Sequence, residues 1–235
     1  QRLFDILDGY TVRFVTGHTH KLFNVTPDAP IVDGHNFREY NSGSVCASWW
    51  WSGNLTPGIH IGTDGTPGGY GIWDVTGTDF QCLYKSTGWP EEYQFRSYDL
   101  NQCHITAEAF APESTEAEME TYSDTYGTKN NKNEILVNVW GYDPEWKVEM
   151  TENGKPLEVT RVVAKDPLHI ISYEAKRLNV GATPTADFVS CATAHMFKAT
   201  ASNATSTIEI KVTDRFGNTY SETMNRPKSL SCSMK

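Results

Sequence analysis

The clearest pattern in the chain is a two-residue alternation of apolar and polar side chains. In residues 207–213 (TIEIKVT), Ile208, Ile210 and Val212 share one face of an extended chain, and charged side chains lie between them. This period predicts a half-buried strand. The following letters, DRFGN and then TYSETM, predict that the strand turns back as a hairpin.

A second group of β-branched residues lies in the middle of the chain. Residues 134–140 (EILVNVW) place Ile135, Val137 and Val139 on one face of a predicted strand. Farther along, Asn153-Gly154 separates VEMTE from KPLEVTRVV. This dipeptide favours a two-residue hairpin turn of type I′, because both residues adopt positive φ readily.

The first hundred residues follow the same plan with more aromatic side chains. YTVRFVTG, FREYNSG, SVCASWWW, GYGIWDV, DFQCLYK and YQFRSYDL are all predicted strands, separated by Gly, Pro and Asp turns. Strands that recur about every ten residues with turns between them are typical of a sandwich. We therefore expect a mostly-β protein.

Helical periodicity is scarce. Residues 114–122 (STEAEMETY) are acidic and lack an apolar stripe, so we expect a surface turn or a short exposed helix there. The polar stretch 112–133 around it is the expected long loop or joint between subdomains.

Composition narrows the function classes. The formal net charge is −9 in 235 residues, which disfavours a nucleic-acid binder because phosphate backbones require a basic face. The five cysteines form no C-x-x-C motif, so they indicate no zinc knuckle or redox pair, and one or two disulfides are compatible with their spacing. No stretch resembles a signal peptide or a membrane span. Because the first residue is Gln, we expect that a preceding segment was removed or omitted.

Candidate metal ligands stand near the start of the chain, in FVTGHTHKLF. His18 and His20 are one residue apart, directly after Gly17 and a β-branched run. In an extended segment both rings would point to the same side, at the end of a strand. Two interpretations are open from these residues alone: a pair of metal ligands, or two polar loop histidines.

The surrounding motifs add a resemblance. VTGHTH resembles the closing motif of the calcineurin-like metallophosphoesterases, and GSVCASWWWSG, DGTPGGYGIWDV, LVNVWGYDPEWKVEM, KDPLH, AHMFKA and VTDRFGNTY resemble the β domain that follows the catalytic domain in a bacterial group of these enzymes. The resemblance runs from about residue 10 onward and is most specific in DGTPGGY and TDRFGN. It implies that His18 and His20 ligate a two-metal centre that activates water against a phosphate ester.

The same resemblance shows which motifs this sequence lacks. The family builds its site from D-x-H, G-D-x-x-D, G-N-H-[DE] and a further histidine before G-H-x-H, and a dinuclear centre requires ligands from all of them. Asp33-Gly34-His35 matches D-x-H by letter but follows GHTH, and we interpret it as a turn. The histidine pair alone is expected to bind zinc, nickel or copper weakly, with Asp33 or His35 as recruitable partners.

Three other features have functional and structural interpretations. Trp49-Trp50-Trp51 could stack on sugars, although strand alternation would bury at least one of these rings. Residues 64–70 (DGTPGGY) form either a tight structural turn or the edge of a substrate site. Three further histidines, His104, His169 and His195, are expected to be structural.

These observations lead to one prediction about organisation and function. Residues 1–44 would be the residual edge of a truncated metallophosphoesterase α/β sandwich, and residues 45–235 an accessory C-terminal β-sandwich with an internal joint near 112–133. The chain would be the C-terminal fragment of a phosphate ester hydrolase, inactive alone, whose complete form uses divalent manganese, zinc or iron. The site residues are His18 and His20 as metal ligands; catalytic residues are not assigned.

Alternatives from other classes remain. The chain could be a non-catalytic binding module of the cell envelope that grips glycan or protein through Trp49 and Trp51, or the product of a broken reading frame. The resemblance suggests export or a periplasmic location and a bacterial source. Strand edges left open at the truncated end predict a homodimer.

Overall fold

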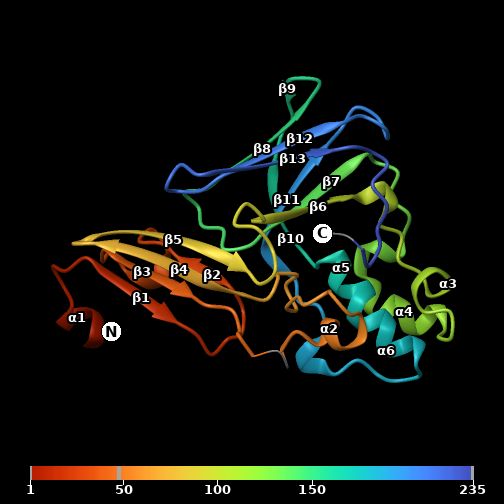
Figure 1. Ribbon diagram of the computed structural model, residues 1–235, viewed down its shortest axis with the longest axis horizontal. Coiled ribbons are helices and arrows are strands. Elements are labelled where there is room, and N and C mark those ends of the chain that lie inside the picture. The colour runs from red at the N-terminus through yellow and green to blue at the C-terminus, as the bar shows by residue number, and fades with distance from the viewer. Residues whose placement is uncertain (1, 47–48, 234–235) are drawn as a thin grey trace.

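The centre of the molecule is a sandwich of two four-stranded antiparallel sheets. The structure, a computed structural model, describes residues 2–46 and 49–233 (Figure 1). The first sheet has the order β10-β11-β7-β6, with bounds Thr160–Ala164, Thr193–Thr200, Glu134–Val139 and Phe95–Asp99. The second has the order β13-β12-β8-β9, with bounds Thr219–Met224, Ile208–Thr213, Lys147–Glu152 and Lys155–Pro156.

The core between the two sheets follows the alternation in the sequence. Ile135, Val137 and Val139 of β7 are buried against Ile208 and Ile210 of β12 in one apolar cluster. Removing each of these side chains from water contributes about 1.5–3 kcal/mol. The predicted inward faces of both segments are thus confirmed, and so is the mostly-β fold.

Helices cover the outer face of the first sheet and form a second core with it (Figure 1). Leu136 of β7 and Met196 of β11 point into this core. Because both faces of the first sheet are covered, β7 is buried along almost its whole length. The covering helices are α3 (Ala107–Phe110), α4 (Glu116–Ser123), α5 (Pro167–His169), the π-helical turn Ile170–Glu174 and α6 (Ala175–Asn179).

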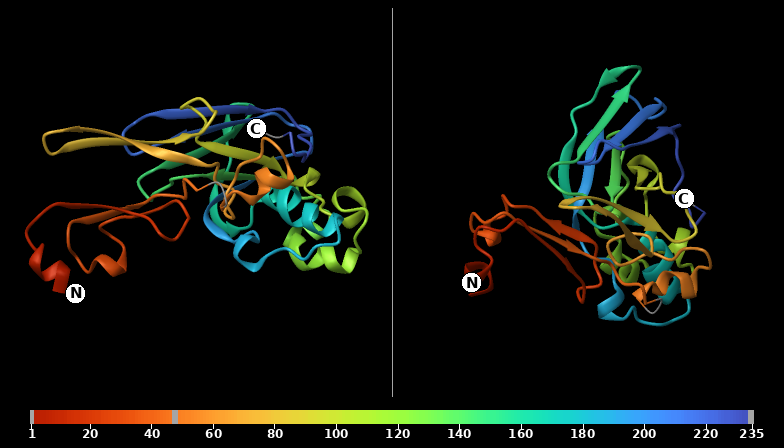
Figure 2. Two further views of the ribbon diagram at one scale, coloured as in Figure 1. Left: turned by 60° about the horizontal axis from the view of Figure 1, so that its bottom comes forward. Right: turned by 60° about the vertical axis from the view of Figure 1, so that its left-hand side comes forward.

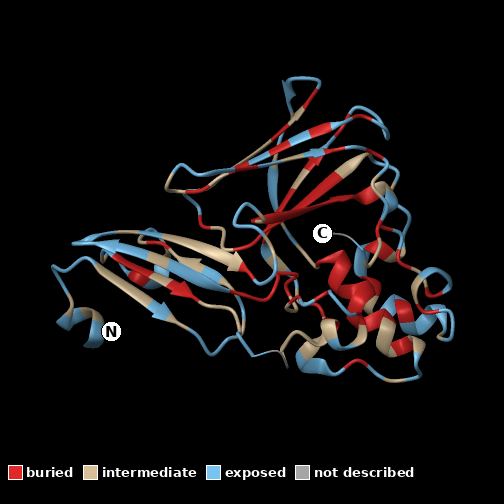
Figure 3. Ribbon diagram, viewed as in Figure 1, coloured by how far each residue is buried: buried red, intermediate tan, exposed pale blue. Residues whose placement is uncertain are grey.

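The first part of the chain forms a smaller, more exposed β unit. Strands β1 (Val12–Thr16), β3 (Phe37–Asn41) and β2 (Phe23–Val25) make a three-stranded sheet in the order β1-β3-β2, in which β1 and β3 are parallel. Figure 2 shows this sheet beside the long hairpin of β4 (Gly69–Thr76) and β5 (Asp79–Ser86), both projecting from the body that holds the sandwich. Figure 3 shows that buried residues dominate the body and are fewer in this projecting part.

Short helical segments connect these parts. Along the chain, helix α1 (Arg2–Ile6) precedes β1, and α2 (Trp51–Leu55) follows β3 and precedes β4. The 3₁₀ turns are Pro30–Val32, Leu100–Gln102, Asp124–Gly127 and Ala186–Phe188.

Both predicted hairpins are confirmed. Strand β12 pairs with β13 across DRFGN, with Thr213 opposite Thr219. Strand β8 pairs with β9 across Asn153-Gly154, whose φ angles of 52° and 73° are the positive values that a type I′ turn requires.

A surface turn or a short helix was expected for the acidic segment 114–122, and the structure has the short helix α4 there. Thr115 and Glu118 close a capping box at the start of α4. Two side chains of this helix are buried, Met119 in the helical core and Ser123 at its last residue. The polar stretch 112–133 is therefore packed onto the body at this point.

The strand predicted for SVCASWWW is wrong. Residues 47 and 48 lie outside the described part of the chain, and the residues after them form a turn and then α2, which begins at Trp51. The three tryptophans therefore do not alternate across a sheet. Each of them is half-buried.

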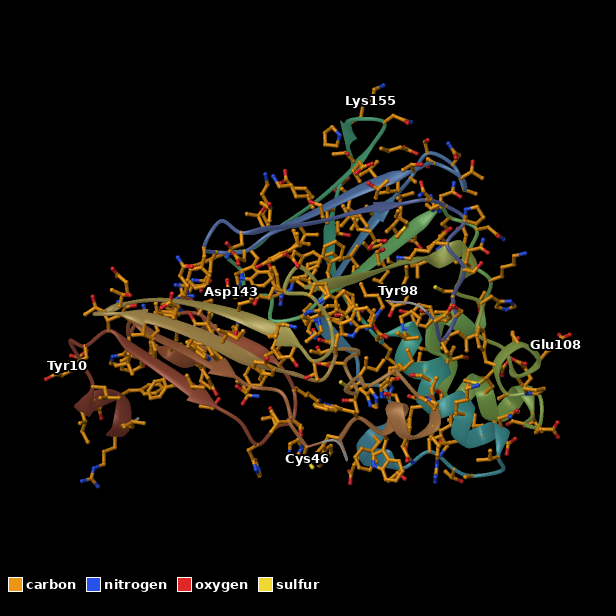
Figure 4. The ribbon with its side chains drawn as sticks, viewed as in Figure 1. Tyr10, Cys46, Tyr98, Glu108, Asp143 and Lys155 are labelled. Atoms are coloured by element: carbon orange, nitrogen blue, oxygen red, sulfur yellow. The ribbon has the colours of Figure 1, made fainter. Side chains whose placement is uncertain are left out.

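Two further features concern thiols and membranes. Among the described residues, Cys82, Cys103, Cys191 and Cys232 form no disulfide; Cys46 lies exposed on the loop that leads from β3 toward α2 (Figure 4), and Cys103 is buried. Within residues 2–46 and 49–233, no helix has the length and apolar character needed to cross a membrane.

Candidate functional site

The two predicted metal ligands lie on the loop that leaves the end of β1. His18 has a φ of 81° and His20 a φ of 61°, so both adopt the left-handed conformation that side chains other than glycine seldom adopt. His18 is exposed and His20 half-buried, and their ring centroids are 6.4 Å apart. Within the described part of the chain, neither imidazole donates or accepts a hydrogen bond, so ring nitrogens remain available to a ligand.

A buried asparagine fixes this loop. The Nδ2 of Asn41, at the end of β3, donates to Oγ1 of Thr19 and to the carbonyl oxygen of Lys21, each at 2.6 Å. Its Oδ1 accepts a hydrogen bond from Oγ1 of Thr16 at 3.0 Å. Asn41 is 1% exposed. It therefore ties the residues before, between and after the two histidines to one point.

An aromatic contact joins the loop to the body. The ring of His20 stacks on Trp49 with centroids 3.8 Å apart. Trp49 and Trp51 both contact the ring of Phe188, with ring centroids 5.0 Å and 5.6 Å apart, respectively. These two tryptophans thus pack where the projecting sheet meets the body.

Asp33 and His35 do not join the histidine pair. Strands β1 and β3 run parallel, with Val12 opposite Phe37 at one end and Thr16 opposite Asn41 at the other. His35 precedes β3, whereas the GHTH loop follows β1, so they lie at opposite ends of the sheet. His35 instead contacts Asp8, with 3.3 Å between Nδ1 and Oδ1. The expectation that Asp33 or His35 could be recruited is therefore wrong, because the parallel register separates them.

The two rings are close enough to serve one metal centre. An imidazole nitrogen lies about 2.0–2.1 Å from a zinc ion, and side-chain rotation lets two rings with centroids 6.4 Å apart approach the same centre. No group of three or more His, Cys, Asp or Glu side chains among the described residues could hold a metal ion.

The DGTPGGY segment forms a tight structural turn. The amide of Thr66 donates to Oδ1 of Asp64 at 2.9 Å, and the amides of Gly65 and Gly68 donate to the carbonyl oxygens of Gly62 and His60. Because these amides are used within the protein, they do not form a cradle for phosphate. Gly65 has a φ of +81°, a conformation that glycine adopts without a Cβ penalty.

A network of buried polar residues holds this turn on the first sheet. Asp166, which is fully buried, accepts hydrogen bonds from the hydroxyl of Tyr98, from Nδ2 of Asn138 and from the amide of His169, at 2.8, 2.8 and 3.0 Å. Asn138 also donates to the carbonyl oxygen of Asp64 at 2.9 Å. Figure 4 shows Tyr98 in the interior, between the sandwich and the helices.

The network continues to a histidine. Nδ1 of His195 lies 2.7 Å from Oδ1 of Asn138, and its Nε2 lies 3.5 Å from Oδ2 of Asp64. Burial raises the pKa of Asp64, but His195 and the amide of Thr66 outweigh that effect, so the pKa is lowered overall. The structural role expected for the histidines at 169 and 195 fits this arrangement.

A serine, a histidine and a glutamate meet near the π-helical turn without forming a catalytic triad. Nδ1 of His169 lies 2.7 Å from Oγ of Ser190 and 3.3 Å from Oε2 of Glu174. A triad uses opposite ring nitrogens for nucleophile and carboxylate, whereas here both partners face the same one. All three side chains are buried. Their arrangement stabilises the helical layer.

The sequence pointed to His18 and His20 as metal ligands, which stays a prediction, and it did not point to Asn41 or to the residues of the buried network. Asn41 sits at a strand end opposite Thr16, which no local pattern reveals. Asp166 carried a local indication: Asp followed by Pro is a frequent start of a helix, and its side chain does cap α5.

Comparison with known proteins identifies the family. Residues 39–220 match the family model described as "C terminal of Calcineurin-like phosphoesterase". No curated protein and no solved structure gave a match. The matched segment begins within β3 and includes α2, the hairpin, the helical layer and most of the sandwich; the GHTH loop precedes it. The chain therefore belongs to the family of C-terminal domains of calcineurin-like phosphoesterases.

Proposed function

We propose that this chain is the C-terminal portion of a metal-dependent phosphate ester hydrolase, in which His18 and His20 are two of the metal ligands. The observation that carries the proposal is the GHTH loop, which presents two neighbouring imidazoles at a strand end beside the family domain. The other ligands would come from polypeptide outside these 235 residues. Residues 1–44 would then be the edge of the catalytic domain, and residues 45–235 the accessory domain.

The exposed apolar side chains of the first residues support this division. Half of the exposed large hydrophobic residues in the described part of the chain fall within residues 1–44, a fifth of its length. They are Leu3, Ile6, Tyr10, Val15, Phe23 and Ile31. This excess supports a surface that another polypeptide segment would cover in the complete protein.

The residues of the loop have separate roles in this proposal. His18 and His20 would bind as neutral imidazoles, and Asn41 would fix the loop that presents them. Such outer hydrogen bonds orient ligands and tune their affinity for the metal. When bound, two divalent metals lower the pKa of a water molecule and hold the phosphate oxygens.

The proposal is tested by metal content and hydrolysis together. The purified chain is assayed for bound metal and for cleavage of an activated phosphate diester with added manganese or zinc, alongside the double variant His18→Ala, His20→Ala. We expect substoichiometric metal and turnover equal to that of the double variant. We also expect that a longer protein, extended upstream in its own reading frame, binds two metals and loses hydrolysis in the same variant.

Two outcomes contradict the proposal. Two tightly bound metals and histidine-dependent turnover in the 235-residue chain would show that it contains a complete site. Upstream extension that yields metal-dependent hydrolysis unaffected by the double variant would remove His18 and His20 from the metal centre.

A further inference from the structure

An open cleft of about 510 Å³ lies between the end of the β4–β5 hairpin, the start of β1 and the turn from β12 to β13. We name it the Arg13–Arg215 cleft; its lining includes Arg13, Asp74, Thr76, Asp79, Phe80 and Arg215. Its volume falls within the range of small-molecule sites. The cleft is separate from the GHTH loop, because Arg13 lies near the start of β1 and that loop follows the end of the strand.

Two arginines of the cleft lie on one aromatic ring. Cζ of Arg13 and Cζ of Arg215 are each 5.4 Å from the centroid of the Phe80 ring. Phe80 in turn packs on Tyr40 and Trp73, with centroids 5.7 Å from each. Stacking on a fixed ring restrains a guanidinium group. Both positive charges are therefore held in place before a ligand arrives.

The positive charges in this region exceed the carboxylates that pair with them. Arg13 lies directly opposite Arg38 of β3, and like charges on neighbouring strands repel. Glu145 accepts a hydrogen bond from Nη2 of Arg38 at 2.5 Å and lies 3.7 Å from Nη1 of Arg215. Among the described residues, no carboxylate lies within 4 Å of Arg13. Burial, together with the charges of Arg38 and Arg215, lowers the pKa of Arg13.

Each arginine also keeps a donor that the protein does not use. Nη1 of Arg13 donates to the carbonyl oxygen of Val12, and Nη1 of Arg215 donates to the hydroxyl of Tyr40. The Nη2 atoms of both arginines have no hydrogen-bond partner among the described residues, and neither atom is fully buried. A carboxylate has two oxygens that accept such charge-assisted hydrogen bonds. Both donors are thus available to a ligand carboxylate.

The hairpin supplies charges of the opposite sign. The register pairs Asp74 with Gln81 and Thr76 with Asp79, so alternation places all four side chains on one face of the hairpin. Both aspartates are exposed and line the cleft. Within the described part of the chain, no contact of 4 Å or less joins either aspartate to the two arginines. The cleft therefore separates positive and negative side chains that do not pair with one another.

We propose that the Arg13–Arg215 cleft binds a small zwitterionic amino acid, a molecule that carries one carboxylate and one ammonium group. The carboxylate would accept hydrogen bonds from Nη2 of Arg13 and of Arg215, and the ammonium group would donate to Asp74 or Asp79. A simple anion would be repelled by the aspartates and a simple cation by the arginines, so a ligand with both charges is the complementary one. This site contains neither histidine of the GHTH loop and does not depend on metal binding.

The test is a titration of the purified chain, followed by the amide chemical shifts of the protein. The probes are glycine, β-alanine, 4-aminobutanoate and glycylglycine, which differ in the distance between their two charges. Each probe is compared with its N-acetyl form, which lacks the ammonium group, and with its methyl ester, which lacks the carboxylate. Inorganic phosphate is titrated as the simple anion.

Three variants and one control connect the shifts to the cleft. Arg13→Gln and Arg215→Gln each remove one cation, and the double variant Asp74→Asn, Asp79→Asn removes the negative wall. Arg161→Gln is the matched control, because Arg161 also lies on an aromatic ring, with its Cζ 4.9 Å from the Tyr142 centroid, but outside the cleft. Near-ultraviolet circular dichroism confirms that each variant is folded.

We expect saturable binding of at least one amino acid, weakened about tenfold or more by either capping group and by Arg13→Gln, because hydrogen bonds between charged groups are lost. Arg215→Gln and the double aspartate variant should also weaken it, and Arg161→Gln should leave it unchanged. If Arg215→Gln fails to fold, Arg13→Gln decides. The proposal is overturned if no amino acid of the panel binds, or if Arg13→Gln leaves binding undiminished. Equal binding of the N-acetyl form, or tighter binding of phosphate, overturns the assignment of a zwitterion.

Discussion

Gly65 lies so close to Asp166 that a Cβ added to the glycine would stand 2.2 Å from Cγ of the aspartate. Asp166 cannot move away, because Tyr98 and Asn138 hold its carboxylate from the sheet side. The contact joins the DGTPGGY turn to the residue that caps the start of α5. The glycine is thus required both by its φ and by the atoms that face it.

Gly65→Ala is therefore expected to destabilise the fold by about 3 kcal/mol or more, since the added methyl group overlaps a buried carboxylate. Gly217→Ala is the control, because Gly217 has a φ of +89° with no atom within 4 Å of an added Cβ. It should cost only about 1–2 kcal/mol, from the left-handed conformation itself. Urea denaturation measures both; equal losses would mean that the contact with Asp166 is unimportant.

The Asp64–His195 contact predicts acid sensitivity. The folded-state pKa of Asp64 lies below its ordinary value of 3.8: burial opposes this, and His195 with the amide of Thr66 outweighs it. When a folded carboxyl has a lowered pKa, its contribution to stability is complete above the unfolded value and is lost as pH falls through the folded value. The stability that Asp64 contributes should therefore decline only below about pH 4.

Asp64→Asn should lower the melting temperature at neutral pH and make its decline below about pH 4 shallower than in the wild type. Thermal denaturation monitored by circular dichroism measures the difference. Asp79→Asn, which changes an exposed carboxylate, should leave the slope unchanged. A parallel decline in wild type and Asp64→Asn would show that this carboxylate is not linked to acid unfolding.

Local patterns were sufficient where the structure depends on local chemistry. The alternation of Ile208, Ile210 and Val212 specified which face of β12 is buried. Asn153-Gly154 specified its turn, because few other dipeptides accept positive φ at two successive residues. The β-branched run before Gly17 likewise predicted that His18 and His20 lie on a loop at the end of a strand, and β1 does end at Thr16.

Local sequence patterns did not predict the structure where contacts with residues distant in the sequence determine it. The segment 167–179 was not predicted to be helical, because most of its side chains through Ala175 are buried and no polar stripe marks a helical period. The three adjacent tryptophans suggested a strand, yet Trp49 and Trp51 pack on Phe188, more than a hundred residues away in sequence. The partners of Asp166 lie 68 and 28 residues away, at Tyr98 and Asn138.

Asn41 should determine how well the GHTH loop is ordered. Asn41→Ala removes the hydrogen bonds to Thr19 and Lys21, each with a net value of about 1 kcal/mol. Amide hydrogen exchange in residues 17–22 should therefore accelerate about thirtyfold, since 1.4 kcal/mol is a factor of ten. The comparison is Asn24→Ala. Asn24 lies on the neighbouring strand β2, and its replacement removes a hydrogen bond to the carbonyl oxygen of Gly141. Equal exchange in 17–22 for both variants would contradict a positioning role for Asn41.

The open side of the three-stranded sheet predicts self-association of this chain. Strand β1 is hydrogen-bonded to β3 alone within the described residues, so its other edge presents unpaired backbone groups. Val15 on this strand is 60% exposed, and Tyr10 just before it 67%. An uncovered edge with apolar side chains pairs readily with another chain.

Light scattering coupled to size-exclusion chromatography should show a concentration-dependent dimer. Val15→Lys should shift it toward monomer, because a charge on an edge strand opposes pairing. Val180→Lys is the control: Val180 is 71% exposed and lies at the end of α6, outside every sheet. A monomer at all concentrations would show that the edge is protected in solution. A dimer unaffected by Val15→Lys would place the contact elsewhere on the molecule.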